Sequence, residues 1–418
     1  MSRGSAGLPH AAAPVSPVRV LLVENTVRGL GGSYESLFLT ATHLDRKRFE
    51  PIVLFFQPNH FAQRLEAEGI RVLVEKSRQF WEKESHGRRT GRLRAGLPRA
   101  GLLGAARRRA AAFFRLLAGG IPMAWTIHRI LARERIGLLH TNNNLQRDAM
   151  TILAGLAAGI PVVAHERQLT PCSPLTGFLS RKVRTLICIS EAVLEFTRTS
   201  GARTRDCRRI YNAIDLDAMK RVKPSLPPGP PRVGIVGRIL PKKGHRIFIE
   251  AAARVHQAFQ AAKFFIIGAA NAEDRAYEDE LRSLATGLGL DDVLCWTGYL
   301  ADPLPTIASL DVVVHAAVEP EPFGRVIIES MALGRPLVAT ALGGPVEIIQ
   351  DGVSGWLVPA GDAPVIAERV LALLRDQDLA RRTGSGALKR AVDFGVEAYI
   401  RQIETVYDDA LRISGSVP

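Results

Sequence analysis

Short apolar runs alternate with stretches of helical periodicity along almost the whole chain. Each run is nearly continuous, as in a strand buried on both faces, and helical patterns separate the runs. This alternation predicts parallel sheets covered by helices on both faces, which is an α/β fold. In the first half of the chain the predicted strands are 18–23, 52–56, 70–74, 137–140, 161–164 and 186–189.

A proline-rich segment at 220–232 interrupts the alternation and predicts a stiff linker. The pattern then restarts, with predicted strands at 233–236, 264–267, 293–296, 312–314, 337–339 and 356–358. Because 418 residues are also too many for one ordinary core, we predict two doubly wound, Rossmann-like domains, 18–219 and 233–390. A final helix within 391–418 should pack back on the first domain. Ligands of such sheets bind beyond the carboxyl ends of the strands, so the two domains should face each other across a cleft.

The composition is that of an ordinary soluble protein, with 47% hydrophobic and 23% charged residues. No run of 18 uninterrupted apolar residues occurs, so no membrane span is predicted. Residues 1–17 are rich in Ala, Gly, Pro and Ser and lack the apolar centre of a secretory signal, which predicts a disordered tail. The four cysteines form no Cys-x-x-Cys pair, which suits a reduced, cytoplasmic protein without a metal cluster.

Most of the net charge of +14 comes from one segment. Between Lys76 and Arg115 there are 12 Lys and Arg residues and two Glu, a local net charge of +10, and apolar residues lie beside the basic ones. We therefore predict that this basic insert, 76–118, meets an anionic membrane surface; the alternative is a solvated basic helix packed on its own domain. Nucleic acid is not predicted as a partner, because no helix-turn-helix, aromatic platform or zinc pattern accompanies the charge.

Two glutamates with seven residues between them flank a Pro-x-Gly break in the second domain. A helix that starts at Phe323 or Gly324 would aim backbone N–H groups at a ligand in front of it. Glu321 lies in the loop before that helix, and Glu329, inside it, could accept hydrogen bonds from vicinal hydroxyls. The pattern favours a polyhydroxylated, phosphorylated ligand; the alternative is a helix start with two unrelated surface glutamates.

The loop Gly237–Gly244 follows the first strand of the second domain and carries two cations that can point at the cleft. Arg238 as a planar fork and Lys243 as a point charge suit a diphosphate leaving group. No Asp-x-Asp pair lies in a suitable loop to hold a divalent metal, so no metal site is predicted, and side chains and helix ends must meet the negative charge. The alternative is a basic loop in solvent.

Glycine-rich turns follow a strand in each domain. Gly29-Leu30-Gly31-Gly32 lets the backbone approach a phosphate or a sugar closely, but it lacks the spacing of the dinucleotide fingerprint, and a plain tight turn remains the alternative. Gly343-Gly344-Pro345 precedes a helix that carries Glu347, which predicts a second helix N-terminus facing the cleft. Asp351-Gly352-Val353-Ser354-Gly355 predicts a structural turn.

Together these motifs resemble a family. Gly-Arg-x3-Lys-Lys-Gly, Glu-Pro-Phe-Gly-x4-Glu, Gly-Gly-Pro-x-Glu and Asp-Gly-x-x-Gly, in this order, are similar to the motifs of the family-4 retaining glycosyltransferases, which have the GT-B fold. In the first domain the resemblance depends on Gly31-Gly32, on Leu139-His140-Thr141-Asn142 and on Ser190-Glu191-Ala192. The segment 211–215 is similar to the family's Asn-Gly-Val-Asp, with Ala213 in place of Gly.

The resemblance implies a role for each matching residue. Arg238 and Lys243 would clamp the diphosphate of a UDP- or GDP-linked sugar, and Glu329 would bind the ribose hydroxyls. Glu321 would face the transferred sugar. The backbone N–H groups of Phe323 and Gly324 would lie beside that sugar, and Gly31 and Gly32 would lie near the donor phosphates or the acceptor. The diphosphate would leave from the face that the acceptor attacks, so that positioning and charge stabilisation carry most of the rate.

One position departs from the family pattern. Many relatives have His-x-His at the end of the fourth strand, and here Asn142 stands where the second His would touch the donor sugar. Asn can bond a sugar hydroxyl but does not titrate near neutrality, and His140 is then either an acceptor contact or structural. After the fifth strand, His165 and Arg167 also face the cleft, and Arg167 would meet an acceptor phosphate or form a surface salt bridge.

The expected protein is a cytoplasmic, metal-independent, retaining glycosyltransferase without a cofactor. Its acceptor would be a glycan or a lipid-linked glycan, in cell-surface polysaccharide or glycolipid biosynthesis, and the insert would hold it on the inner membrane face. The alternatives are a nucleotide-sugar epimerase or phosphorylase of the same fold, or a non-catalytic membrane- or glycan-binding scaffold.

Overall fold

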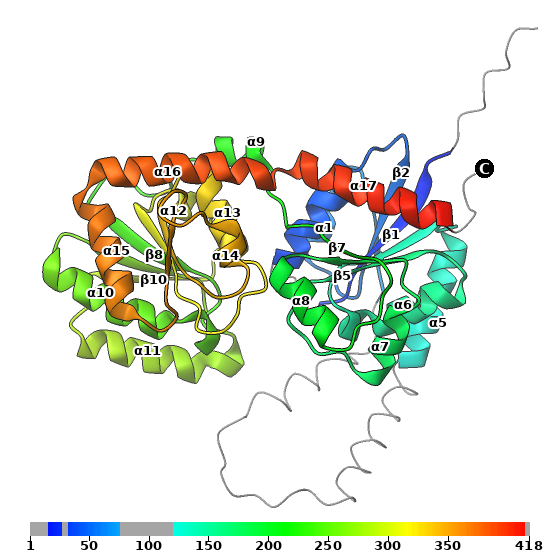
Figure 1. Ribbon diagram of the computed structural model, residues 1–418, viewed down its shortest axis with the longest axis horizontal. Helices are drawn as coiled ribbons and strands as arrows, with labels where there is room; N and C mark the ends of the chain where they lie inside the picture. The colour runs from blue at the N-terminus through cyan, green and yellow to red at the C-terminus, as the bar shows by residue number, and fades with distance from the viewer. Residues whose placement is uncertain (1–15, 27–31, 76–119, 414–418) are drawn as a thin grey trace, which may run out of the picture.

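The structure is a computed structural model that describes residues 16–26, 32–75 and 120–413. Two α/β domains lie side by side, and two helices near the C-terminus run along one edge of both (Figure 1). Almost all of the predicted tail 1–17, Gly31 and the whole basic insert 76–118 lie outside the described residues. Among the helices that the structure describes, none combines the length and the apolar character needed to cross a bilayer.

The first domain has a seven-stranded parallel sheet in the order β3-β2-β1-β4-β5-β6-β7 within the described residues. Its strands are β1 (Val18–Glu24), β2 (Phe49–Phe55), β3 (Arg71–Val74), β4 (Leu138–Thr141), β5 (Val162–Glu166), β6 (Thr185–Cys188) and β7 (Cys207–Arg209). The six predicted strands are present. The short edge strand β7 was not predicted, because Arg208 and Arg209 interrupt the apolar pattern there.

Helices cover both faces of this sheet (Figure 1). They are α1 (Gly32–His43), α2 (His60–Ala67), α5 (Ile121–Arg133), α6 (Leu145–Ala157), α7 (Pro174–Ser180) and α8 (Glu191–Thr199). Asn59, Asn144, Ser173 and Ser190 cap α2, α6, α7 and α8 through their side chains, which satisfies N–H groups that the helices leave open.

The second domain has a six-stranded parallel sheet in the order β10-β9-β8-β11-β12-β13 within the described residues. Its strands are β8 (Arg232–Val236), β9 (Lys263–Ile267), β10 (Leu294–Gly298), β11 (Val312–His315), β12 (Leu337–Thr340) and β13 (Trp356–Val358). Its helices are α10 (His245–Ala258), α11 (Arg275–Gly287), α12 (Leu304–Ile307), α13 (Arg325–Ala332), α14 (Pro345–Ile348), α15 (Ala363–Arg375) and α16 (Gln377–Ala391). The predicted fold class, two doubly wound α/β domains, is confirmed.

Two segments connect the domains. The helix α9 (Leu216–Arg221) and an extended stretch lead from the first domain into β8, and the C-terminal helix α17 (Val396–Ile413) returns to the first domain. The apolar face of α17 packs in the same buried cluster as β1 and β2, and the ring of Tyr407 meets Phe49 edge-on with 5.4 Å between centroids. The core of the first domain therefore includes the last described helix.

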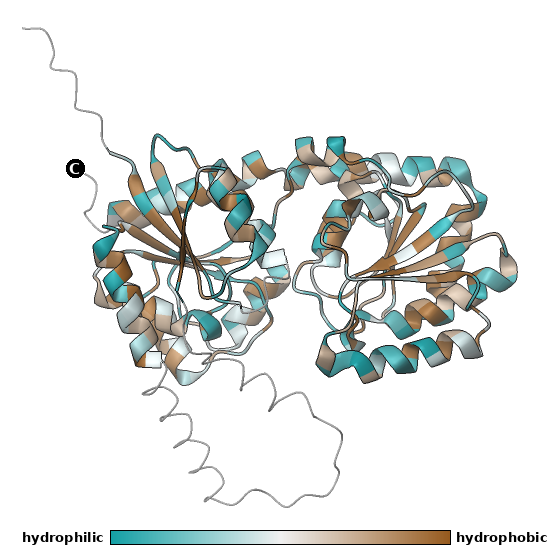
Figure 2. Ribbon diagram, turned by 180° about the vertical axis from the view of Figure 1, so that it is seen from behind, coloured by the Kyte–Doolittle hydropathy of each residue, from teal (hydrophilic) through white to brown (hydrophobic). Residues whose placement is uncertain are grey.

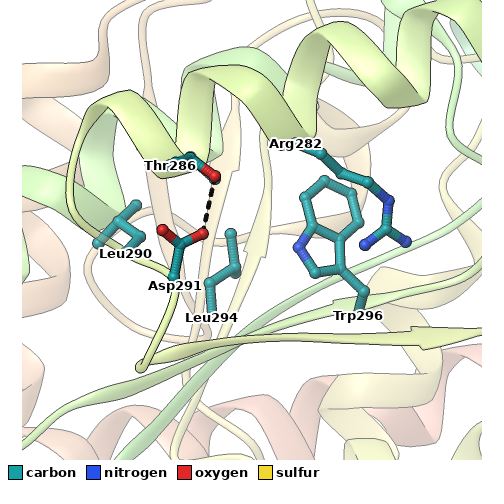
Figure 3. Close-up of a pocket in the computed structure, with 7 residues that line it drawn as sticks. Arg282, Thr286, Leu290, Asp291, Leu294 and Trp296 are labelled. Atoms are coloured by element: carbon teal, nitrogen blue, oxygen red, sulfur yellow. Dashed lines mark hydrogen bonds between the residues drawn. The ribbon is translucent and has the colours of Figure 1, made fainter.

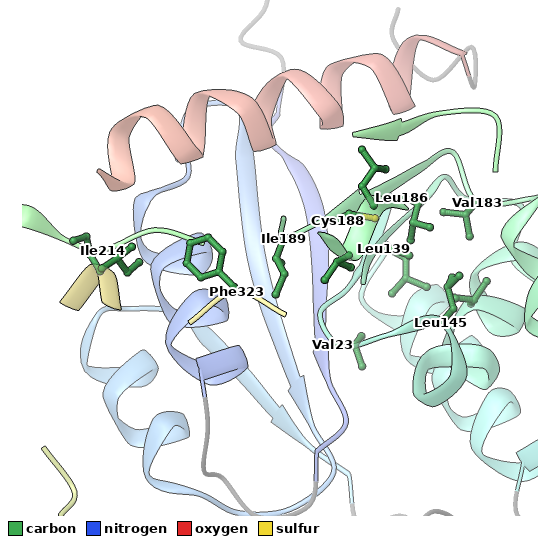
Figure 4. Close-up of a cluster of buried hydrophobic side chains, with 14 of the residues drawn as sticks. Val23, Leu139, Leu145, Val183, Leu186, Cys188, Ile189, Ile214 and Phe323 are labelled. Carbon is green, nitrogen blue, oxygen red and sulfur yellow. The ribbon is translucent and has the colours of Figure 1, made fainter. Parts of the chain in front are cut away.

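Hydrophobic residues predominate in the strands of both sheets (Figure 2). One buried cluster runs from the first sheet through the connecting segment into the second domain, and in it Phe323 of the second domain lies between Ile189 and Ile214 (Figure 4). Phe323 is buried and packs its ring against Tyr211 and Phe394. Its side chain is therefore a core contact between the domains, and only its backbone can belong to a ligand site.

Candidate active site

The loops after β8 and β11 bring together two of the predicted site residues. The Nζ of Lys243, in the 3₁₀ turn Pro241–Lys243, lies 2.5 Å from Oε2 of Glu321. The next residue, Gly244 (φ 72°), must be glycine, because a Cβ there would lie 1.7 Å from the carbonyl oxygen of Ala316. The end of β11 thus fixes the turn that carries Lys243 against the loop that carries Glu321.

His315, the last residue of β11, completes this group and was not predicted. Its side chain is 7% exposed, and its Nε2 lies 3.6 Å from Oε2 of Glu321. Neither ring nitrogen has a hydrogen-bond partner among the described residues. In the sequence, His315 ends an apolar strand six residues before Glu321, and only the folding of that loop back over the strand end brings the two together.

The carboxyl group of Glu321 is strongly biased toward its ionised form. Burial alone would raise its pKa, but the charge of Lys243 and then the contact with His315 outweigh burial, and the pKa lies well below the usual value. A fixed negative charge beside two nitrogen groups can orient a sugar hydroxyl or stabilise positive charge on a sugar ring.

Two glycines hold the backbone of this loop in place. A Cβ on Gly343 (φ 80°) would lie 2.4 Å from the carbonyl oxygen of Glu321, and one on Gly344 would lie 2.5 Å from that of Phe323. The Gly344 N–H donates to Glu321 O at 2.8 Å. The Gly-Gly-Pro motif therefore lets two backbones touch. Helix α14 begins directly after the two glycines, as predicted, and carries Glu347, but it has four residues only.

The helix α13 begins at Arg325, one residue after the predicted start at Gly324, and Gly324, with a φ of 101°, is its N-cap. Glu329 lies one turn inside and is paired with Arg325, whose Nε and Nη2 lie 3.2 Å and 3.1 Å from Oε1. Burial raises the pKa of Glu329, although Arg325 opposes that shift. Arg325 was not predicted as a site residue, because a basic residue in the first turn of a helix usually lies in solvent.

Arg238 is exposed in the segment between β8 and the 3₁₀ turn that carries Lys243, whereas the two residues after it, Ile239 and Leu240, are buried. Loss of water, followed by the charge of Lys243 and with a further contribution from Arg238, lowers the pKa of the neighbouring Lys242. The three cations therefore act on one another. Such a concentration of positive charge at the carboxyl edge of the sheet suits a polyphosphate.

In the first domain Asn142 follows β4 at the carboxyl edge of the sheet. Its Nδ2 donates to Oε2 of Glu24 at 2.8 Å and to Ser33 O at 2.9 Å, and its Oδ1 accepts from Arg167 at 2.8 Å. The amide is thus held by β1, by the start of α1 and by the segment after β5. This network fixes Asn142 beside the start of α1.

Arg167 is buried, and its guanidinium donates to protein oxygens. Nε and Nη2 donate to the backbone and side-chain oxygens of Asn142, both at 2.8 Å, and Nη1 donates to Oδ1 of Asn212 at 2.5 Å. Both roles predicted for Arg167, binding an acceptor phosphate and forming a surface salt bridge, require an accessible guanidinium. The structure instead makes Arg167 a brace between Asn142 and the segment before α9.

His140 lies in β4, as predicted, and His165 lies in β5, because β5 extends to Glu166, two residues beyond the predicted end. Their rings stack, with 2.7 Å between Nε2 of His140 and Nδ1 of His165, and Nδ1 of His140 lies 2.6 Å from the hydroxyl of Tyr407. Burial, followed by the charge of Arg167, lowers the pKa of His140 to about 3. A structural role of His140 fits this geometry, because the two histidines connect the sheet to α17 through Tyr407.

Two motifs from different domains meet beside the site. The Oγ of Ser190 donates to Pro322 O at 2.6 Å, and the carboxylate of Glu347 accepts from the N–H groups of Glu191 and Ala192 at 2.7 Å and 2.8 Å. Glu347 thus places a negative charge on the positive end of α8. The contact presses the loop next to Glu321 against the first domain.

Two cavities lie away from this group. One, of about 250 Å³, is between α11 and β10, where Arg282 lies over the ring of Trp296 and Thr286 bonds Asp291 (Figure 3). The other, of about 210 Å³, lies beside Tyr211 and Phe394. None of the residues proposed from the sequence for donor or acceptor binding lines either cavity.

Known proteins are similar to this chain in sequence and in fold. Residues 218–390 match the glycosyl transferases group 1, and residues 30–218 match Glycosyltransferase Family 4. A lipopolysaccharide core biosynthesis glycosyltransferase, LpsE of Rhizobium meliloti, is 31% identical over 57% of this chain and 66% of its own length. A phosphatidyl-myo-inositol mannosyltransferase of Mycobacterium leprae is 34% identical over 50% of this chain and 55% of its own length. The matches thus span less than two thirds of these relatives.

The crystal structure of Anabaena HepE in complex with UDP-glucose has a TM-score of 0.73 and 25% identity, over 93% of this chain and 99% of HepE. Sucrose-phosphate synthase from Thermosynechococcus elongatus, at 19% identity and a TM-score of 0.69, shares the fold over 95% of this chain. The chain therefore belongs to the family-4 glycosyltransferases and has their GT-B fold.

Proposed function

We propose that this protein is a retaining glycosyltransferase that moves a sugar from a nucleotide-diphosphate sugar to a glycan or lipid-linked acceptor. The observation that carries the proposal is the contact of Lys243 with Glu321 in front of α13, with Arg238 on the same edge. Cations for a diphosphate and a carboxylate for a sugar thus lie within one group. The UDP-glucose in the HepE complex supports a UDP-linked donor, and a GDP-linked donor is the alternative.

The diphosphate would bind Arg238 and Lys243, which would meet its charge without a metal or a cofactor. The backbone N–H groups of Phe323 and Gly324 would lie beside the transferred sugar. In the reaction the bond between the anomeric carbon and the diphosphate oxygen breaks, and a bond to the acceptor oxygen forms on the same face. The acceptor proton passes to the leaving phosphate. Cations placed at that phosphate stabilise the charge that develops there, which is the largest contribution that such a site can make.

The remaining site residues would bind or position the substrates. Glu329 would bind the ribose, Glu321 the transferred sugar, and Asn142 a sugar hydroxyl by exchanging one of its present partners. Gly31 would lie near the donor phosphates or the acceptor. His140, His165 and Arg167, predicted from the sequence as acceptor contacts, would instead support Asn142 and α17 through the hydrogen bonds described above.

The acceptor class draws support from the relatives, whose names refer to lipopolysaccharide core and to phosphatidyl-myo-inositol. A lipid-linked acceptor would bring the protein to the inner face of the membrane. The charge of +10 between Lys76 and Arg115 would then attract anionic lipids, and the protein would be cytoplasmic and peripheral.

Ligand binding and turnover test the proposal separately. UDP, GDP or one of their sugar derivatives should raise the melting temperature, since a ligand that binds only the native state stabilises it. Glu321→Ala and Lys243→Ala should each lower turnover of the donor about 100-fold or more, on the scale of losing one charge-stabilising group. Turnover like that of wild type in both variants would remove the site assignment.

A further inference from the structure

One side chain of the second domain reaches across to the first domain at two points. Arg325, the first residue of α13, donates from Nη1 to the carbonyl oxygen of Ala213 at 3.2 Å. Its aliphatic part lies against Gly32, the first described residue of α1. The same guanidinium holds Oε1 of Glu329 at 3.1–3.2 Å, and only 14% of each of the two paired side chains is exposed.

The contact with Gly32 gives a physical reason for a glycine at that position. A Cβ on Gly32 would lie 2.3 Å from Cδ of Arg325, 3.3 Å from its Cγ and 3.4 Å from its Nε. These three atoms are the nearest ones that the added carbon would meet, and all belong to Arg325. The backbone of Gly32 is helical, so a side chain is otherwise compatible with it. The glycine therefore makes room for a side chain of the opposite domain.

The bonds of Arg325 extend this contact to the donor site. Arg325 can touch Gly32 and Ala213 only when the two domains are as close as they are here, and in that position it holds the carboxylate of Glu329. If Arg325 is displaced from Gly32, the fork that orients Glu329 is displaced with it. One residue thus connects the approach of the domains to the geometry of the second glutamate of the Glu-x7-Glu pair.

We propose that Arg325 is a positioning residue of the transfer reaction, which closes over Gly32 and aims Glu329 at the ribose of the donor. This inference depends on the proposed function, because it assigns Glu329 to the donor. Because Gly32 has no side chain, Arg325 can reach this position when the two domains are close together. The competing explanation of Gly32 is close approach of a phosphate to its backbone, and the two explanations predict different results.

A double-mutant cycle in the full-length protein separates them. Gly32→Ala and Arg325→Ala should each raise the KM for the donor about tenfold with a smaller change in kcat, which corresponds to one lost charge-assisted hydrogen bond. The double variant should be no worse than either single variant, because both remove the same contact. Arg325→Lys should recover part of the KM, since it keeps the stem and the charge. Gly287→Ala, whose Cβ would meet nothing within 4 Å, is the matched control.

Melting temperatures of the same variants, measured without ligand, report the contact independently of turnover. Gly32→Ala should lower the melting temperature when Arg325 is present and leave it unchanged or raise it in the Arg325→Ala background, because Ala is the better helix former. If Gly32→Ala raises the KM and lowers the melting temperature by the same amounts with and without Arg325, the proposal is wrong and a phosphate at Gly32 is favoured. If wild type turns over no nucleotide sugar, the proposed function fails, and the positioning role fails with it even where the melting temperatures show the contact.

Discussion

At the scale of single residues, the site is a set of carboxylates that protein cations already hold. Glu321 is paired with Lys243, and Glu329 with Arg325. A diphosphate would compete with Glu321 for Lys243. His315, at 3.6 Å, is then the neighbour that remains to keep Glu321 ionised and oriented.

His315→Phe should therefore shift the acid limb of the pH profile of kcat/KM to higher pH. The pKa of Glu321 is lowered by Lys243 and His315 against the effect of burial, so removing His315 raises that pKa, and the ionised form disappears at a higher pH than in wild type. At neutral pH the rate should fall about tenfold, as for one lost polar contact to a charged group.

Steady-state kinetics between about pH 4 and pH 8 check this prediction. His315→Asn, which keeps a donor at the same place, should lie between His315→Phe and wild type. An unchanged acid limb in both variants would show that His315 does not act on Glu321.

Buried histidines should make the stability depend on pH. The pKa of His140 is lowered from its ordinary value near 6.5 to about 3 in the folded protein. Between about pH 6.5 and pH 3, His140 is therefore protonated in the unfolded chain but not in the folded one. Falling pH therefore favours unfolding, by up to about 1.4 kcal/mol per pH unit for each such group. His140→Gln lacks this titration, so the stability difference between it and wild type should shrink as the pH falls below about 6.5.

Urea unfolding at pH 7, 6 and 5 measures this difference. Tyr407→Phe is the matched control, because it removes the hydroxyl bonded to His140 but keeps both rings. It should cost about 1 kcal/mol at each pH and leave the slope unchanged. Parallel curves for His140→Gln and wild type would contradict the prediction.

At the scale of elements, two helix N-caps differ in whether the capping serine also contacts the other domain. Ser173 caps α7 within the first domain, whereas Ser190 caps α8 and also donates to Pro322 in the second domain. The N-terminus of α8 is covered by Glu347, so this helix end is an interdomain contact. The end of α7 has a local role only.

Ser173→Ala and Ser190→Ala should both lower stability by about 1 kcal/mol, the usual cost of a lost side-chain cap. Only Ser190→Ala should also lower donor turnover, because it releases the loop that carries Glu321. Thermal unfolding and kinetics on the two variants provide the comparison. Equal turnover in both would mean that the bond to Pro322 has no part in positioning the site.

At the scale of the whole molecule, the charge of the basic insert leads to a test of membrane binding. Full-length protein should sediment with vesicles that contain anionic lipid and not with neutral ones. Replacing Arg107, Arg108 and Arg109 by Glu should weaken sedimentation about 100-fold or more, since each basic residue near such a surface contributes about 1 kcal/mol. Raised salt should weaken wild-type binding, and binding that ignores both salt and the replacements would exclude an electrostatic role of the insert.

The fold could be predicted almost completely, because buried parallel strands have an apolar signature that does not depend on distant residues. The positions of Lys243, Glu321 and Glu329 followed from motifs within single loops. His315 and Arg325 could not be found in that way, since their roles depend on a loop folding back and on a contact between domains. Arg167 looked accessible for the same reason, because its partners are 25 and 45 residues away.

The return of α17 to the first domain has a consequence for biosynthesis. The ribosome releases β1 to β7 long before residues 396–413, yet the apolar cluster around β1 and β2 needs Tyr399, Ile403 and Tyr407 to be complete. The first domain must therefore wait, with that apolar surface uncovered, while the second domain is translated. Nascent chains arrested before residue 396 should bind chaperones through this surface and release them once α17 has emerged.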